Sequence, residues 1–141
     1  MNKILLIFLL FIGLGSSQDT IYFVYNAKND FGSIVGDFLH KSFAPKTYPC
    51  RLCDITYGPF SKKKSWKNYL DTIQYEYEFL YKNHIEEYSM NILSYPVILI
   101  GTKTNYNVLV STQEINNMKN LNEMINTINQ SLIKYKVDKN K

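Results

Sequence analysis

The 141-residue sequence lacks several patterns that would identify a function directly. It has no Gly-x-x-x-x-Gly-Lys-Ser/Thr loop to hold a nucleotide's phosphates, and no nucleophile elbow of the kind that α/β-hydrolases use. It has no internal repeat and no low-complexity linker. After the N-terminal segment, no apolar run reaches the ~20 residues that a membrane-spanning helix needs. These absences exclude P-loop nucleotide-binding proteins and elbow-type hydrolases, and they predict that the chain after its N-terminal segment has no transmembrane span.

Cysteine is scarce, and the two that occur, Cys50 and Cys53, are three residues apart. A Cys-x-x-Cys pair can close a disulfide, exchange electrons with another protein or supply two ligands to a metal ion, because each use needs two neighbouring sulfurs. In an extended chain the two Cα atoms would be about 10 Å apart, which is too far for a disulfide. The pair therefore needs a turn at residues 51–52, and Pro49 favours an abrupt approach to it by restraining Tyr48.

A metal site at this pair would need further ligands, and the sequence has only two histidines. His40 is the nearest and is the candidate partner of Cys50 and Cys53, with Asp54 next. On the predicted helical pattern His40 lies opposite the apolar stripe, so it either faces solvent or points toward the cysteine loop. His84 lies in a polar run and receives no role. A structural disulfide, a redox-active dithiol and a metal site all stay open, and no cofactor is predicted.

The first 17 residues predict a secretory signal peptide. Lys3 is followed by the apolar run 4–14 and then by small residues, among them Gly15 and Ser17, which is the order of a cleaved signal. We expect cleavage after Ser17 and export to the periplasm or the extracellular space. An uncleaved N-terminal anchor is the alternative if the apolar helix continues past the glycines. Export favours the disulfide, because thiols oxidise outside the cytoplasm.

The formal net charge is +4, and lysines gather at residues 62–67 and 134–141. A basic patch could meet an anionic membrane or nucleic acid. Lysine is abundant throughout the chain, however, so we interpret both groups as solvated surface and predict no nucleic-acid partner. Residues 134–141 are predicted to form a flexible basic tail. The partner predicted is a thiol–disulfide exchange protein or an envelope protein, and the oligomeric state stays open.

The spacing of apolar residues predicts alternating strands and helices. Continuous apolar runs indicate buried strands and period-two alternation indicates a half-exposed one, so strands are predicted at residues 21–25, 54–57, 75–81, 97–100 and 107–110. Spacings of three and four indicate helices, which are predicted at residues 31–39, 61–73, 84–90 and 121–132. Ser61 is the expected cap of the second helix, and the last two strands are expected to form an antiparallel hairpin.

This order predicts a thioredoxin-like α/β fold over residues 18–133. The expected domain has three layers, with a central mixed sheet of four or five strands flanked by helices. The first strand–helix–strand unit should be parallel and right-handed. In this fold a cis-proline commonly begins the third core strand and faces the reactive site. Pro96 occupies that place before the strand 97–100, so we predict a cis Tyr95–Pro96 bond; a trans proline at a strand start is the alternative.

Residues 47–58 resemble the most specific stretch of an uncharacterised family of small bacterial proteins, with the pattern Tyr-Pro-Cys-x-Leu-Cys-x-x-Thr-Tyr-Gly. The resemblance covers most of the chain after the signal, through Tyr25-Asn26-Ala27, His40-Lys41, the stretch from Tyr48 to Gly58, Trp66 and Pro96. It implies a thioredoxin-like fold and the same candidate site, but no particular reaction. Some relatives carry a GTPase label, which the missing phosphate loop argues against. Relatives mostly lack a signal sequence, and Tyr81 stands here where they have a histidine.

Two functional hypotheses follow, and they leave open whether the protein is an enzyme. In the first, the pair performs thiol–disulfide exchange, with Cys50 as the exposed nucleophile, Cys53 resolving and Pro96 nearby. The pair precedes a predicted strand, so activation by a helix dipole is expected to be absent, and Arg51 is the only cation inside the motif. In the second, a non-enzymatic envelope domain binds a partner or metal and uses the cysteines structurally. A solvent-open Cys50 favours exchange, and two buried sulfurs favour structure.

Overall fold

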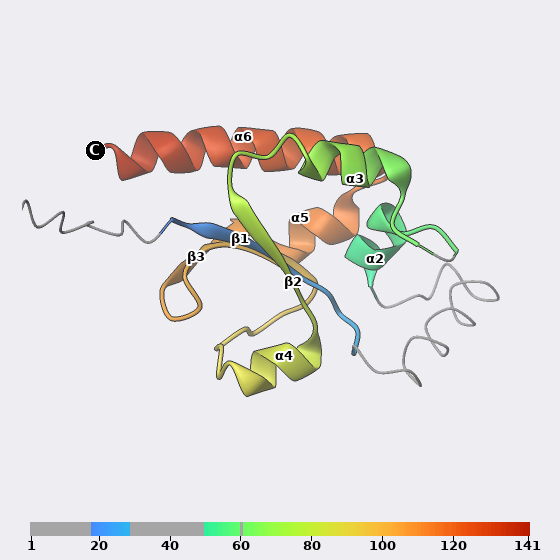
Figure 1. Ribbon diagram of the computed structural model, residues 1–141, viewed down its shortest axis with the longest axis horizontal. Helices are drawn as coiled ribbons and strands as arrows, with labels where there is room; N and C mark the ends of the chain where they lie inside the picture. The colour runs from blue at the N-terminus through green and yellow to red at the C-terminus, as the bar shows by residue number, and fades with distance from the viewer. Residues whose placement is uncertain (1–17, 29–49, 60) are drawn as a thin grey trace, which may run out of the picture.

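The computed structural model describes residues 18–28, 50–59 and 61–141 (Figure 1). The predicted signal peptide, the predicted helix 31–39 and His40 lie outside these residues. The elements, in chain order, are β1 (Thr20–Val24), α2 (Arg51–Thr56), α3 (Lys64–Leu70), β2 (Glu76–Leu80), α4 (Lys82–Glu87), β3 (Val97–Gly101), β4 (Tyr106–Val110), α5 (Thr112–Asn117) and α6 (Leu121–Lys139). No helix in the described part of the chain combines the length and apolarity that crossing a bilayer requires.

The four strands form one mixed sheet in the order β2-β1-β3-β4. β1 is parallel to β2 and antiparallel to β3, and β3 and β4 form the predicted antiparallel hairpin. β3 therefore runs against the other three strands. The α/β fold with a four-stranded mixed sheet between helices is confirmed, and it is compatible with a thioredoxin-like fold.

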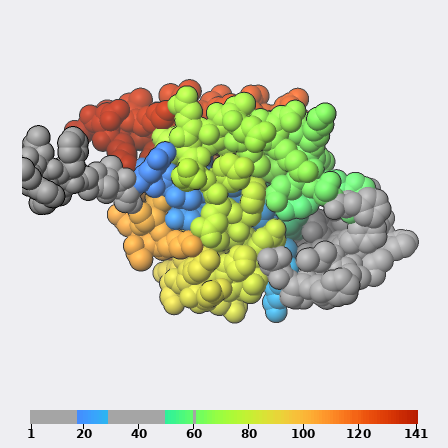
Figure 2. All heavy atoms as spheres, viewed as in Figure 1, coloured from blue at the N-terminus to red at the C-terminus, as the bar shows by residue number. Residues whose placement is uncertain are grey.

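The sheet separates two hydrophobic clusters, because side chains alternate between the faces of a strand. In β1, Ile21 and Phe23 belong to the larger cluster, and Tyr22 and Val24 belong to the smaller one. Figure 1 shows α3 and α6 on one side of the sheet and α4 on the other. In the space-filling view, the segment from α3 through β2 to α4 covers much of the visible face and leaves little of β1 in sight (Figure 2). β1 is thus a central strand, as its continuous apolar run predicted.

The prediction of a strand at residues 54–57 is wrong, because residues 54–56 form the second half of helix α2 and Tyr57 is its C-cap. Ile55 and Thr56 are β-branched, which favours strands when the local sequence is considered alone. In the structure the Thr56 hydroxyl donates to the Leu52 carbonyl at 2.6 Å, and the Asp54 amide donates to the Cys50 carbonyl at 3.0 Å. These local hydrogen bonds stabilise the helical conformation in spite of the strand propensity of Ile55 and Thr56.

Two further helices differ from the prediction. Helix α3 begins at Lys64 with Lys63 as its N-cap residue, so the predicted Ser61 cap is wrong. Helix α5 was not predicted, although its signal is present: the Ser111 side chain accepts from the Glu114 amide, while the Glu114 carboxylate accepts from the Ser111 amide. This reciprocal pair is a capping box, which can be read from the sequence.

The C-terminal segment is helical almost to its end, so the predicted flexible tail is wrong from residue 134 to Lys139. The physical reason is an anchor to the start of the domain. The Tyr135 hydroxyl donates to the Asp19 carboxylate at 3.0 Å, and the Lys139 ammonium forms an ion pair with the same carboxylate. The Asp19 carboxylate, just before β1, therefore binds the last turns of α6.

Candidate functional site: the Cys50–Cys53 disulfide

Cys50 and Cys53 form a disulfide, with the two sulfurs 1.97 Å apart and the two Cα atoms 5.2 Å apart. The turn that the sequence required is the first turn of α2. Cys50 is the N-cap residue of this helix, and its sulfur accepts a hydrogen bond from the Cys53 amide at 3.2 Å. The bridge thus links the residue that begins the helix to the third residue within it.

Both half-cystines are buried, Cys50 completely and Cys53 with 8% of its surface exposed. They belong to the larger hydrophobic cluster, together with Tyr25 and Trp66. The prediction that Cys50 is the more exposed sulfur is therefore wrong. Its sulfur accepts from the Cys53 amide in the first turn of α2, and the residue packs within the larger hydrophobic cluster. Buried structural cysteines are inert, because an attacking thiolate cannot reach the sulfur.

Arg51, between the two cysteines, connects α2 to the segment that joins α5 and α6. Its Nε and Nη2 donate to the Met118 carbonyl at 2.9 Å and 2.7 Å, and Nη2 also donates to the Lys119 carbonyl at 3.0 Å. Its Nη1 forms an ion pair with Asp54. The cation inside the motif is thus occupied by backbone carbonyls and a carboxylate. Sequence reasoning identified this charge but could not find partners 67 residues away.

The prediction that the pair lacks a neighbouring helix N-terminus is also wrong, since α2 begins directly after Cys50. The backbone amides at a helix start carry partial positive charge, which favours a negative group there. This placement favours thiolate chemistry at the site. Its effect is limited, because α2 contains only 6 residues.

A hydroxyl pair anchors α2 to the sheet behind the disulfide. The Tyr25 hydroxyl lies 3.2 Å from the Thr56 hydroxyl, and Tyr25 is fully buried. Burial raises the pKa of Tyr25 well above 10.0, with the Thr56 hydrogen bond opposing the rise. The Tyr81 ring stacks on Tyr25 with centroids 5.5 Å apart, so Tyr81 belongs to an aromatic cluster around Tyr25. The sequence analysis did not single out Tyr25 or Thr56 as site residues; the available signal was a tyrosine at the end of a fully apolar strand.

The Tyr95–Pro96 peptide bond is cis, which confirms the prediction. Pro96 is buried and directly precedes β3. Two residues later Ile98 joins the cluster that contains Cys50. The register pairs Val97 with Val24, so Pro96 lies just beyond the paired end of β1, where the chain continues to Tyr25.

The metal interpretation has no support within the described residues. They contain no group of three or more histidine, cysteine, aspartate or glutamate side chains placed to hold a metal ion. His40, the proposed third ligand, lies outside them. His84 has a local role instead: its Nδ1 accepts from the Tyr81 amide at 3.4 Å at the start of α4.

Comparison of the chain with protein-family models, with curated proteins and with solved structures found no match. The resemblance carried by the cysteine motif therefore stays a prediction. The function has to be argued from the disulfide and the groups around it.

Proposed function

We propose that the protein is an exported thioredoxin-like domain that acts by binding a partner, with Cys50–Cys53 as a permanent structural disulfide. The observation that carries this proposal is the burial of both half-cystines in the main hydrophobic cluster. Exchange requires an incoming thiolate to approach one sulfur along the S–S axis. The burial of both residues, with Cys50 at 0% and Cys53 at 8% exposure, argues against such an approach.

The disulfide has a clear structural task in this arrangement. It closes the first turn of α2, which contains Arg51, and this turn presents the guanidinium to the carbonyls of Met118 and Lys119. The bridge and the arginine together fix α2 against the connection between α5 and α6. The N-terminal signal pattern supports the proposal, because an oxidising compartment would keep the bridge closed.

Thiol–disulfide exchange is the second candidate, and two observations favour it. The disulfide begins a helix, and the buried cis-Pro96 begins a strand that contributes to the same cluster. In this alternative an incoming thiolate bonds to the sulfur of Cys53, the less buried of the two residues, and Cys50 leaves as a thiolate with the electrons of the broken S–S bond. A second thiol of the donor protein then displaces Cys53 and completes the reduction.

Trapping of free thiols separates the two candidates. The oxidised full chain is incubated with reduced glutathione and then alkylated with a maleimide reagent, in native buffer and in denaturant. The structural proposal predicts no alkylation of the native protein and alkylation of both cysteines after unfolding. The Cys53→Ala variant is the matched control, because its single Cys50 thiol should alkylate slowly while the domain is folded. Rapid reduction in native buffer would favour exchange.

A further inference from the structure

The two edges of the sheet differ in how they resist pairing with another strand. Natural proteins protect exposed edges with charged residues or proline. The edge strand β2 carries Glu76 and Glu78, and Glu78 forms an ion pair with Lys103 at 3.2 Å. The opposite edge strand β4, Tyr-Asn-Val-Leu-Val, contains neither a charge nor a proline, and its central residue Val108 is 61% exposed. β4 is thus the edge suited to strand addition.

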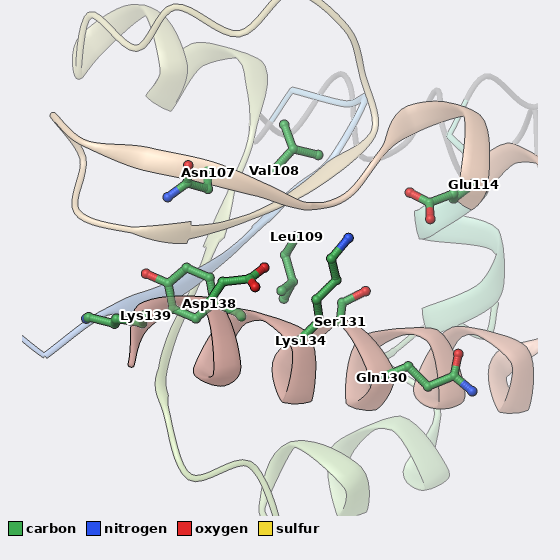
Figure 3. Close-up of a pocket in the computed structure, with 10 residues that line it drawn as sticks. Asn107, Val108, Leu109, Glu114, Gln130, Ser131, Lys134, Asp138 and Lys139 are labelled. Carbon is green, nitrogen blue, oxygen red and sulfur yellow. The ribbon is translucent and has the colours of Figure 1, made fainter. Parts of the chain in front are cut away.

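A groove runs beside this edge. It has a volume of about 750 Å³ and lies between β4 and the C-terminal half of α6. Figure 3 shows the Lys134 ammonium rising from α6 toward β4, with the Asp138 carboxylate one turn further along the helix, while Val108 points away from α6. A strand added to β4 would lie along this groove and meet both charges.

We propose that β4 pairs antiparallel with β4 of a second copy of the chain, so that two sheets join into one across a two-fold axis. Such an interface is self-complementary. If one residue contacts a second residue of the other copy, the second residue of the first copy contacts the first residue of the other copy. Antiparallel pairing of β4 with itself is compatible with this symmetry and places the two Val108 residues near the axis. The interface does not use the disulfide, so it is independent of the function proposed above.

The charges on α6 favour a second copy as the occupant. A two-fold axis reverses the direction of α6, so Lys134 of one copy faces the partner's Asp138, and Asp138 faces the partner's Lys134. Among the described residues Asp138 forms only a loose ion pair, with Lys141 at 3.9 Å, and its side chain is 58% exposed. Lys134 has no ion pair with a described residue. Both charges are therefore available to form two equivalent pairs across the axis.

Sedimentation equilibrium of the full chain over a range of concentrations tests the proposal. We expect a concentration-dependent dimer, and we expect Val108→Lys to abolish it, because a lysine at the centre of the edge blocks strand addition. Lys134→Asp and Asp138→Lys each place like charges together twice, so each should weaken the dimer on the order of tenfold. The double variant restores opposite charges and should recover the wild-type affinity.

Glu76→Lys is the matched control, since it makes the same charge change as Asp138→Lys but at the other sheet edge. It should leave the dimer unchanged. Far-UV circular dichroism should show that every variant keeps its fold, because all four positions are exposed. A chain that stays monomeric up to its solubility limit overturns the proposal, even if another protein binds at β4. A dimer that survives Val108→Lys, or charge changes that do not compensate in the double variant, also overturns it.

Discussion

Replacement of both cysteines with alanine should cost the domain about 4 kcal/mol of unfolding free energy. The bridge closes a loop with a sequence separation of only 3, and the chain-entropy relation gives about 2 kcal/mol at 25 °C for a loop of this size. Each buried sulfur also leaves a space about the size of a methylene group, which costs about 1 kcal/mol. For a domain of this size the sum corresponds to a fall in Tm of about 15 °C.

Urea unfolding of three species separates these contributions. The reduced wild-type protein keeps both sulfurs, so it should lose only the ~2 kcal/mol of the closed loop, whereas Cys50→Ala/Cys53→Ala should lose both parts. Leu93→Ala is the control for loss of an apolar side chain, because Leu93 is 91% exposed and its truncation should change stability by less than about 0.5 kcal/mol. A reduced protein as stable as the oxidised one, or more stable, would refute the reasoning, because redox-active oxidants stabilise their reduced form.

Three further predictions concern single groups. Arg51→Ala should lower the urea-unfolding free energy by about 2 kcal/mol, because charge-assisted hydrogen bonds to two backbone carbonyls are lost; full recovery in Arg51→Lys would contradict this, since lysine cannot reproduce the guanidinium geometry. Because burial raises the pKa of Tyr25, the contribution of its neutral hydroxyl to folding stability is complete below pH 10. This contribution is lost as pH rises toward the folded-state pKa, with a slope of up to about 1.4 kcal/mol per pH unit. Urea midpoints measured from pH 9 to 11 should therefore fall less steeply in Tyr25→Phe than in the wild type, and equal slopes would exclude Tyr25 as the cause. Ser111→Ala should lower the unfolding free energy by about 1 kcal/mol in thermal unfolding at neutral pH. Hydrogen bonds from Ser111 lower the pKa of Glu114 below 4.5, so the stability difference between the wild type and this variant should shrink as pH falls through the folded-state pKa. A constant stability difference down to pH 2 would contradict the assignment.

The sequence allowed the strands to be predicted because their signals are local. β1 and β3 are continuous apolar runs, and β2 alternates, so burial on two faces or on one could be inferred without knowing the partners. Pro96 was recognised because its place before an apolar strand is also a local feature. Helix α2 was missed because Ile55 and Thr56 favour a strand, while the hydrogen bonds that hold the helix depend on how residues 50–56 pack.

The position of the candidate site in the chain was predicted from the sequence, but the burial of its two cysteines was not. The spacing of Cys50 and Cys53 predicted a possible bridge, since only a turn was needed to close it. Burial depends on contacts that are distant in the sequence, such as the bonds from Arg51 to Met118. No local pattern contains that information, and this explains why Cys50 was expected at the surface and lies in the core.

The most direct test of the structural-disulfide account is the equilibrium redox potential of the Cys50–Cys53 pair in the full-length folded protein. The oxidised and reduced fractions are measured by alkylation and mass spectrometry after equilibration with a series of dithiol buffers. The account predicts a potential below about −300 mV, where the glutathione pool cannot reduce the bridge. A potential between about −120 and −270 mV, the range of dedicated thiol–disulfide oxidoreductases, would contradict it.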